Sequence, residues 1–413
     1  MSIENIAFIA LFVTAVTLFT LKIREIIANI RMGQAIDRSG NASERWKTML
    51  LVAFGQKKMF SRPLPAVLHL AVYVGFVIIN IELLEIIIDG ATGSHRALSF
   101  LGGFYNLLIA SFEVLAFLVI VACVIFLARR NIVKVARFHY REMTSFPKSD
   151  ANLILIAEVL MMSAFLIMNA SDLILQGRGV EHFTVAGAFP ISQFLVPMMD
   201  GMSEGALVLL ERACWWFHII GILGFALYVT YSKHLHIFLA FPNTYFSKLE
   251  PMGHINNMPV VTTEVKSMLG LATSETPTEA PGRFGAKDVN DLSRVNLMAA
   301  YACTECGRCT AECPANLTGK KLSPRKIMMD TRDRMEEVGK SIASGGPGLQ
   351  DGKSLLGDYI TKEEINACTS CNACVEACPV LINPLEIILE MRRYVAMEES
   401  GSPAQCNVMF QNI

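Results

Sequence analysis

The chain has 413 residues, of which 53% are hydrophobic and only 18% are charged. This composition is too apolar for an ordinary soluble protein and indicates a membrane domain, while the length allows two or three domains. The formal net charge is −1, so no basic field indicates binding to nucleic acid.

Five apolar stretches are each long enough to cross a bilayer, which takes about 20 helical residues. They cover roughly residues 4–22, 64–88, 104–128, 151–175 and 205–232. Nine basic residues follow the first stretch and six follow the third, against one in each of the other two loops. The positive-inside rule therefore predicts a multi-pass inner-membrane protein with a periplasmic amino terminus and a cytoplasmic region after the fifth helix.

Four histidines, His69, His218, His234 and His236, fall in these stretches or at their ends, where an imidazole is costly unless it has a function. His218 and His236 are separated by 18 residues, so on one continuous helix they would share a face about 27 Å apart, as two stacked haems require. His69 lies near the cytoplasmic start of the second stretch, at the depth expected for His236 or His234. The pattern predicts that His69 and His236 are axial ligands of a b-type haem; core histidines satisfied by neighbours remain the alternative.

The segment from Phe217-His218 to His234-Leu235-His236 resembles the last membrane helix of the di-haem gamma subunit of respiratory nitrate reductase. The resemblance covers roughly residues 1–240 and implies five helices with an external amino terminus. In that family the second helix supplies two histidines ten residues apart, and here His69 matches the inner one while Ile79 occupies the other position. A second haem on His218 would therefore need another partner, with these candidates: Asn80, Glu82, His95 and His182.

Acidic residues within the apolar stretches are informative, because ionisable groups in a membrane mark proton paths or ligand sites. Glu82, Glu113 and Glu211 fall in the outer half, and Glu158 lies nearer the cytoplasm. We interpret them as a proton path or a pocket for menaquinone or another quinone, although an ion pair with Arg212 is an alternative for the outer acids. We expect an outer quinone site if a second haem is present and an inner site near Glu158 if it is not.

A linker is expected over residues 241–287, because this segment is rich in Pro, Thr, Met and Gly and has no sustained apolar period. The segments Thr276-Pro277-Thr278 and Ala280-Pro281-Gly282 lie within it. The expected domains are thus a membrane domain (1–240), this linker, a helical cluster domain (288–400) and a tail (401–413).

Two copies of the pattern C-x2-C-x2-C-x3-C-P follow the linker. The first contains Cys303, Cys306, Cys309 and Cys313, and the second contains Cys368, Cys371, Cys374 and Cys378. This is the spacing of two-cluster ferredoxins, in which three cysteines hold one 4Fe-4S cluster and the fourth holds the other. It therefore predicts that Cys378 joins the first three cysteines and that Cys313 joins the second three. Structural zinc usually has two C-x2-C pairs, and disulfides need an oxidising compartment, so neither fits as well.

Each motif precedes a helix-start signal, Ser323-Pro324 in the first copy and Asn383-Pro384 in the second. The motifs are offset by 65 residues and form an internal repeat. Thr361 and Glu364 have capping-box spacing before the second motif. This arrangement resembles the helical two-cluster ferredoxin of the C subunit of heterodisulfide reductase and of the succinate and glycerol-3-phosphate dehydrogenase families.

Across nearly its whole length, the chain resembles the membrane anchors of heterodisulfide-reductase-like complexes, including electron-transfer-flavoprotein:menaquinone oxidoreductases. The resemblance implies an all-α protein that transfers electrons between quinone, haem b, two 4Fe-4S clusters and a soluble partner. No CCG pair occurs in the sequence, so the terminal reaction is expected on another chain, either a CCG-domain subunit or an electron-transfer flavoprotein. A membrane redox sensor or docking platform that reports the quinone state is the alternative.

Overall fold

The computed structural model describes residues 2–271 and 283–412, and within these ranges it contains helices and turns but no β-strand. The all-α prediction is therefore confirmed. The chain divides into two compact units, the first formed by residues 1–24 and 59–235 and the second by residues 25–58 and 236–413. We describe each unit by itself.

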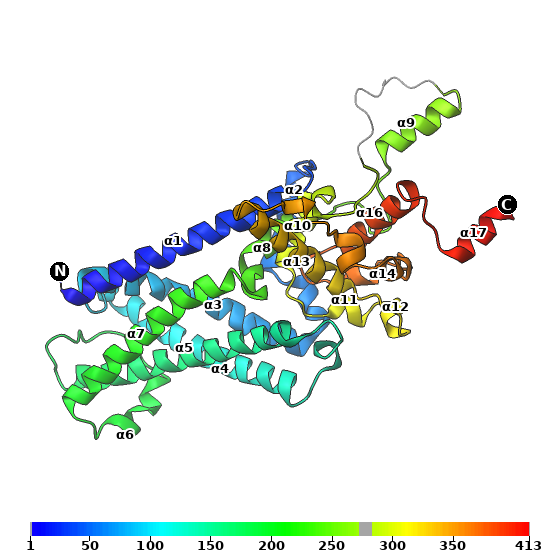
Figure 1. Ribbon diagram of the computed structural model, residues 1–413. Helices are drawn as coiled ribbons and strands as arrows, with labels where there is room; N and C mark the ends of the chain where they lie inside the picture. Colours follow the sequence, from blue (N-terminus) through cyan, green and yellow to red (C-terminus); the bar gives the residue numbers. More distant parts are fainter. Residues whose placement is uncertain (1, 272–282, 413) are drawn as a thin grey trace. The chain divides into compact units, whose positions relative to one another are not determined.

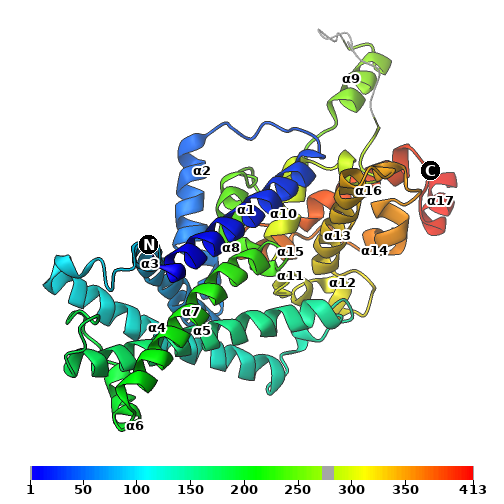
Figure 2. The ribbon, with the colours of Figure 1, turned by 60° about the vertical axis from the view of Figure 1, so that its left-hand side comes forward.

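The first unit, here called the membrane unit, contains five helices long and apolar enough to span a bilayer. They are α1 (Ile3–Arg31, whose residues from Glu25 onward belong to the second unit), α3 (Pro63–Thr92), α4 (Gly103–Asn131), α5 (Ser145–Gly177) and α7 (Glu204–Val229). All five predicted spans are thus confirmed. Helix α5 packs against both α4 and α7, and α3 packs against α4 (Figure 1 and Figure 2).

Short elements connect these helices. They are η2 (Lys57–Ser61), η3 (Ser99–Leu101), η4 (Ala136–Phe138), η5 (Ser192–Phe194), α6 (Val196–Met199) and η6 (Lys233–Leu235).

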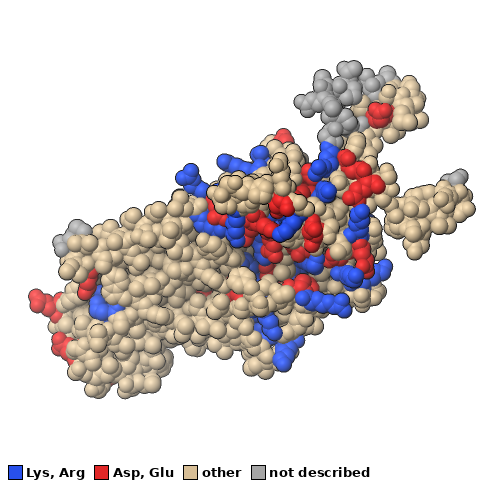
Figure 3. Space-filling view, viewed as in Figure 1, with Lys and Arg blue, Asp and Glu red and all other residues tan. Residues whose placement is uncertain are grey.

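The membrane unit buries aromatic and aliphatic side chains between its helices and exposes others on its outer faces. Ile109, Phe165 and Ile219 are completely buried, while Leu84 and Leu107 are more than half exposed. Few charged side chains appear over the membrane helices in Figure 3, whereas many appear over the second unit. An apolar outer face around a packed interior is what a helix bundle in lipid needs.

Helix α7 ends at Val229, so the predicted continuous helix from His218 to His236 is wrong. The buried carboxylate of Asp150 accepts hydrogen bonds from Tyr228 Oη at 2.5 Å and Ser232 Oγ at 2.7 Å, and it also accepts one from the backbone N–H of Lys233 at 3.2 Å. These bonds stabilise a turn in place of further helix, because a buried carboxylate needs several donors. His236 instead begins a new helix, α8 (His236–Tyr245), and the spacing argument based on one helix no longer applies.

The second unit, here called the cluster unit, is built from many short helices. Before and within the linker region these are α2 (Ala42–Met49), η1 (Leu50–Phe54), α8 and α9 (Pro259–Met268). From the first motif region onward they are η7 (Val289–Asp291), α10 (Arg294–Ala302), α11 (Arg308–Ala311), α12 (Pro314–Leu317), α13 (Pro324–Ala343), η8 (Gly348–Gln350), η9 (Leu355–Tyr359), α14 (Lys362–Asn366), α15 (Ala373–Ala377), α16 (Pro384–Met397) and α17 (Ala404–Gln411).

Residues 25–58 belong to the cluster unit, although the sequence analysis assigned them to the membrane domain. The buried Asn29 donates a hydrogen bond to the Tyr301 hydroxyl at 2.9 Å, and Arg38 forms an ion pair with Glu386 at 3.1 Å. The backbone N–H of Gln34 also bonds to the carbonyl of Leu292 at 2.8 Å. The segment after the first membrane helix is therefore an integral part of the cluster unit.

The expected linker, residues 241–287, contains two helical segments. Helix α8 extends into it as far as Tyr245, and all of α9 lies inside it. Asn243 on α8 donates to the carbonyl of Val380 at 2.6 Å, which attaches this helix to the segment after the second motif. The motifs Thr276-Pro277-Thr278 and Ala280-Pro281-Gly282 lie outside the described residues.

All three predicted helix starts in the cluster unit are confirmed. Ser323 caps α13 by accepting from the N–H of Lys326, and Asn383 caps α16 by accepting from the N–H groups of Leu385 and Glu386. Thr361 and Glu364 form the predicted capping box of α14. Each side-chain oxygen satisfies amide groups that a helix end leaves unpaired.

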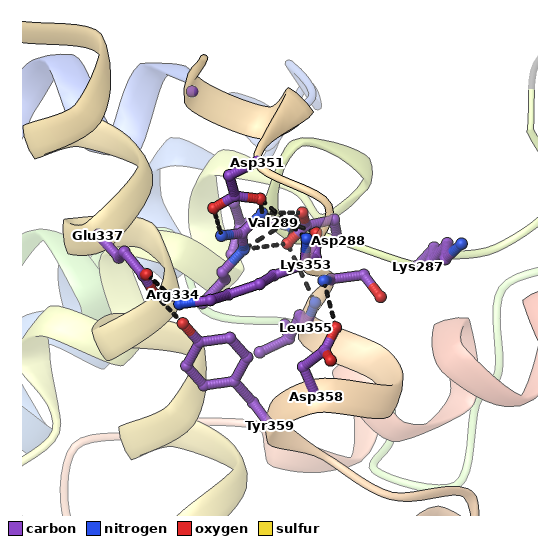
Figure 4. Close-up of polar contacts among 12 residues, drawn as sticks. Lys287, Asp288, Val289, Arg334, Glu337, Asp351, Lys353, Leu355, Asp358 and Tyr359 are labelled. Carbon is purple, nitrogen blue, oxygen red and sulfur yellow. Dashed lines mark hydrogen bonds and ion pairs between the residues drawn. The ribbon is translucent and has the colours of Figure 1, made fainter. Parts of the chain in front are cut away.

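A buried ionic network fixes α13 to the segments on both sides of it (Figure 4). Arg334 is fully buried and contacts Asp288 at 2.8 Å and Asp351 at 2.5 Å. Hydrogen bonds from Arg334 hold the pKa of Asp351 at about 2, while Asp288 also accepts from the N–H groups of Val289 and Leu355. The network thus joins Asp288 at the start of η7, helix α13 and the turn before the second motif.

Replacing Arg334 by Leu is expected to destabilise the cluster unit by about 3–5 kcal/mol, because Asp288 would remain buried without its cation. Thermal bleaching of the cluster absorbance in the full chain would measure this loss. The control is Lys353→Met, whose exposed cation belongs to the same network and should contribute less than about 1 kcal/mol. Equal melting temperatures for Arg334→Leu and the parent would contradict the prediction.

Candidate functional site

The two cysteine motifs have the same backbone conformation at equivalent positions. Glu305 and Ser370 both have left-handed φ angles, 53° and 54°, and so do Gly307 and Asn372, at 70° and 62°. Alternating right- and left-handed residues turn successive amide N–H groups toward one side, which is the geometry that binds anionic groups such as iron–sulfur clusters. The repeat is therefore structural as well as sequential.

The first three cysteines of motif one share a cavity with the end of motif two. Cys303, Cys306 and Cys309 line this cavity together with Cys378, and Cys374 also reaches its wall. Burial raises the pKa of the Cys378 thiol to about 11, and the neighbouring Cys306 thiol adds to the rise. We call these four residues, Cys303, Cys306, Cys309 and Cys378, the first cysteine group.

The other four cysteines form a second group, Cys313, Cys368, Cys371 and Cys374. Burial, together with the neighbouring thiols of Cys368, Cys313 and Cys371, raises the pKa of the Cys374 thiol to about 12. The pKa of Cys313 is also raised by burial and then by Cys368 and Cys371. The structure thus brings the cysteines together in the combination that crossed ligation requires, while the ligand assignment itself stays a prediction.

Both groups fit a cluster better than a single ion. Among the described residues, no three His, Cys, Asp or Glu side chains converge closely enough to hold one metal ion. A 4Fe-4S cluster is a larger body, held by thiolates spread around it. Two N–H groups already bond to sulfur here, from Ser370 to Cys368 at 3.4 Å and from Ile382 to Cys378 at 3.3 Å. Such bonds stabilise a thiolate and influence the potential of the cluster that it holds.

Cys313→Ser is expected to damage the cluster of motif two more than that of motif one, because Cys313 lies with Cys368, Cys371 and Cys374. Electron paramagnetic resonance and iron content of the reduced protein would measure both clusters. The reciprocal variant Cys378→Ser should damage the cluster of motif one, and Cys406→Ser should change neither. Loss of the motif-one cluster alone in Cys313→Ser would rule out crossed ligation.

His218 is completely enclosed in the membrane unit and has a fixed tautomer. Its Nδ1 lies 3.0 Å from the carbonyl oxygen of Met161. Since a carbonyl can only accept, Nδ1 carries the proton and Nε2 keeps its lone pair. This is the second-sphere hydrogen bond typical of a histidine that ligates a metal.

His218 lines a narrow apolar cavity of about 80 Å³ between α3, α4, α5 and α7, here called the slot. Two acids, Glu82 and Glu158, line the same slot, as does Asn80. His95 and His182, the other candidate partners, instead line a different cavity. Among the described residues, the slot therefore offers one imidazole rather than a facing pair.

The polar cavity has a volume of about 380 Å³ and lies among residues of α1, α3, α5, α7 and the loops that follow α3 and α5. Its wall includes Glu82, Arg96, Asp172, Glu211 and Trp215. A pocket of this volume is large enough for a small organic ligand. Glu82 lines both this cavity and the slot, so it lies at the boundary between them.

The four predicted acids have different environments. Glu113 accepts hydrogen bonds from Asn169 and from the backbone N–H groups of Ile191 and Ser192, which identifies it as an anchor for that loop. Glu211 is paired with Arg212 at 2.5 Å, as the alternative interpretation of the outer acids proposed. By contrast, Glu82 is 6% exposed and its Oε2 has no hydrogen-bond partner among the described residues.

The sequence analysis missed a buried polar network beside Glu82. Arg96, a residue of the loop after α3, pairs with Asp172 at 2.5 Å and donates to Asn169 and Tyr105 at 3.1 Å each. Tyr105 in turn donates to Glu85 at 2.9 Å. Asp172 and Asn169 fall in the fourth apolar stretch, and polar residues at such positions could have indicated a network.

The predicted haem ligands His69 and His236 fall in different units. His69 lies in the second turn of α3 in the membrane unit, and His236 is the first residue of α8 in the cluster unit. Both residues are partly buried. Their pairing on a haem stays a prediction.

Comparison with protein families places residues 302–382 in the 4Fe-4S dicluster domain. This region contains all eight motif cysteines. The protein is thus an iron–sulfur protein with a helical two-cluster domain and five candidate membrane helices.

The relatives of the full chain are iron–sulfur oxidoreductases. It is 29% identical to "Probable iron-sulfur-binding oxidoreductase FadF" of Bacillus subtilis, over 93% of this chain and 54% of that protein. It is 24% identical to "EtfAB:quinone oxidoreductase" of Syntrophomonas wolfei, over 92% and 52% respectively. A component of the dihydromethanophenazine:CoB–CoM heterodisulfide reductase from Methanosarcina acetivorans is 31% identical over 28% of each chain. The chain spans about half the length of the first two relatives, and no solved structure matches it.

Proposed function

We propose that this protein is a membrane electron-transfer subunit that links a quinone pool to a cytoplasmic redox partner through haem b and two 4Fe-4S clusters. The observation that carries the proposal is the presence of two interlocked four-cysteine groups on the same chain as five apolar helices. The name EtfAB:quinone oxidoreductase, given to a relative matched over 92% of this chain, supports quinone as the membrane substrate. The soluble partner is an electron-transfer flavoprotein or a CCG-domain subunit.

In this proposal, His69 and His236 would hold a haem b near the cytoplasmic face, and a second haem would use His218 as one axial ligand. The bond between His218 and the Met161 carbonyl supports His218 as one axial ligand, since it leaves Nε2 free to coordinate. A bound haem would supply one-electron transfer within the membrane, and the clusters would continue it on the cytoplasmic side.

An electron-transfer subunit can be distinguished from a redox sensor or docking platform by whether its cofactors are only reduced once or are reduced and reoxidised repeatedly. Adding a reduced menaquinone analogue to the purified full chain should reduce haem and clusters, and an added oxidised electron-transfer flavoprotein should restore the oxidised spectrum repeatedly. Reduction without turnover would favour the sensor. In His69→Ala, we expect the low-spin haem spectrum to be lost while the cluster spectrum persists; an unchanged haem spectrum would exclude His69 as a ligand.

The outer acids support a quinone site at the polar cavity, with Glu82 as the proton carrier. Quinone chemistry moves protons with electrons, so a site needs a carboxyl group that is free to take or release one. Glu82 meets this condition better than Glu113 or Glu211, whose carboxylates are already bonded. Glu158 on the slot is the corresponding candidate for an inner site.

Glu82→Gln is expected to slow quinol-dependent haem reduction by about a hundredfold, the lower end of the range for loss of a proton-transfer group, without changing the haem spectrum. Stopped-flow absorbance at the haem band would measure the rate. Glu4→Gln is the control, because Glu4 lines the same cavity but is exposed. If Glu82→Gln behaves like the parent and Glu158→Gln is slow, the outer site is wrong.

A further inference from the structure

We propose that the cluster held by the first cysteine group has the higher reduction potential of the two, and that the buried side chains of Arg325 and Arg308 set this difference. The inference rests on the electron-transfer function proposed above and adds the direction of transfer within the cluster unit. An electron entering at the second cysteine group would move to the first, and no other bond or proton need change in that step.

Two arginines form part of the wall around the first cysteine group. Arg325 is fully buried and Arg308 is 4% exposed, and both line the cavity of Cys303, Cys306, Cys309 and Cys378. Arg325 Nη1 donates a hydrogen bond to the backbone carbonyl of Glu305 at 3.3 Å, and the backbone N–H of Arg325 donates one to Thr310 Oγ1 at 3.2 Å. The start of α13 therefore holds this cation beside the motif-one loop.

The internal repeat shows what the second half has in place of these residues. Counted from the first cysteine of each motif, Arg308 corresponds to Ala373 and Glu305 to Ser370. Counted from the proline that begins α13 and α16, Arg325 corresponds to Leu385. The wall around the first cysteine group thus has two buried cations, Arg308 and Arg325, and one buried anion, Glu305. The three equivalent positions of the second half carry no charge.

The next shell of charge does not cancel this difference. Arg332 on α13 pairs with Glu305 at 2.8 Å, and its equivalent on α16, Arg392, donates to Ser370 Oγ and to the Cys368 carbonyl, so each half has one such arginine. Lys58 pairs with Glu376 at 3.5 Å, so this cation and anion offset one another.

Apart from the buried Glu305, which pairs with Arg332, the acids within the two motifs are in contact with solvent. Glu376 is 65% exposed where it pairs with Lys58, and Glu312 is also exposed. Exposed charges are screened by water and salt, while buried charges act through a medium of low permittivity. The buried arginines therefore dominate the local field.

Reduction adds one negative charge to a cluster, so a nearby buried cation stabilises the reduced form and raises the reduction potential. We expect the two arginines together to shift the distribution of an electron between the clusters at least tenfold toward the first. For a one-electron couple, a tenfold change corresponds to about 59 mV.

The test replaces each arginine by the residue that its repeat partner already has, giving Arg325→Leu and Arg308→Ala. Midpoint potentials of both clusters would be measured in the full chain by dithionite titration with redox mediators, monitored by electron paramagnetic resonance. Signals are assigned with Cys313→Ser, which should remove the motif-two cluster. In each arginine variant the higher potential should fall and the lower potential should stay unchanged.

Arg325→Lys is the matched control, because it keeps the charge and should retain the parent potential within a small shift. Arg308→Ala provides an independent measurement if Arg325→Leu loses iron. The proposal is overturned if the motif-two cluster has the higher potential, or if an arginine variant with both clusters assembled leaves the gap unchanged. Because dithionite replaces quinol here, failure of quinone-linked reduction would contradict the proposed function without affecting this result.

Discussion

Each cysteine group in this protein draws three sulfurs from one motif and one from the other, and the rest of the cluster unit is arranged to keep the two motifs together. The short helices that carry the third cysteines, α11 and α15, pack against each other. Helices α13 and α16 begin with the same proline-and-cap signal and also pack together. The Arg334 network then fixes the connection between the motifs. Crossed ligation, as predicted, would make separation of the two halves costly, because each cluster would lose one of its four ligands.

Sequence patterns predicted those parts of the fold that depend on neighbouring residues. Apolar stretches gave the five membrane helices because length and hydropathy are local properties, and Ser323, Asn383 and Thr361 marked helix starts because a cap acts within one turn. The end of α7 could not be predicted in this way. It depends on Asp150, a residue about eighty positions earlier in the chain, whose carboxylate binds the turn after Val229.

The acids of the membrane unit illustrate the same limit for the candidate site. Glu82, Glu113 and Glu211 look equivalent in sequence, because each is a carboxylate in an apolar helix. Their partners differentiate them: backbone amides hold Glu113, Arg212 holds Glu211, and Glu82 keeps an oxygen without a donor among the described residues. A carboxylate with several donors is stabilised as an anion, whereas one without donors is free to exchange a proton. Donors come from distant segments, so composition and spacing could identify the acids but not their roles.

The membership of residues 25–58 in the cluster unit has a consequence for how such a protein can be divided. A cut near residue 240, where the membrane helices end in sequence, would give a soluble fragment without Asn29 and Arg38, and so would remove the partners of Tyr301 and Glu386. Tyr301 lies two residues before Cys303, so the exposed gap would open beside the first cysteine group. The cluster unit is therefore discontinuous in the chain, and exchanging it between relatives by recombination would require crossovers near residues 24, 58 and 235 rather than a single one.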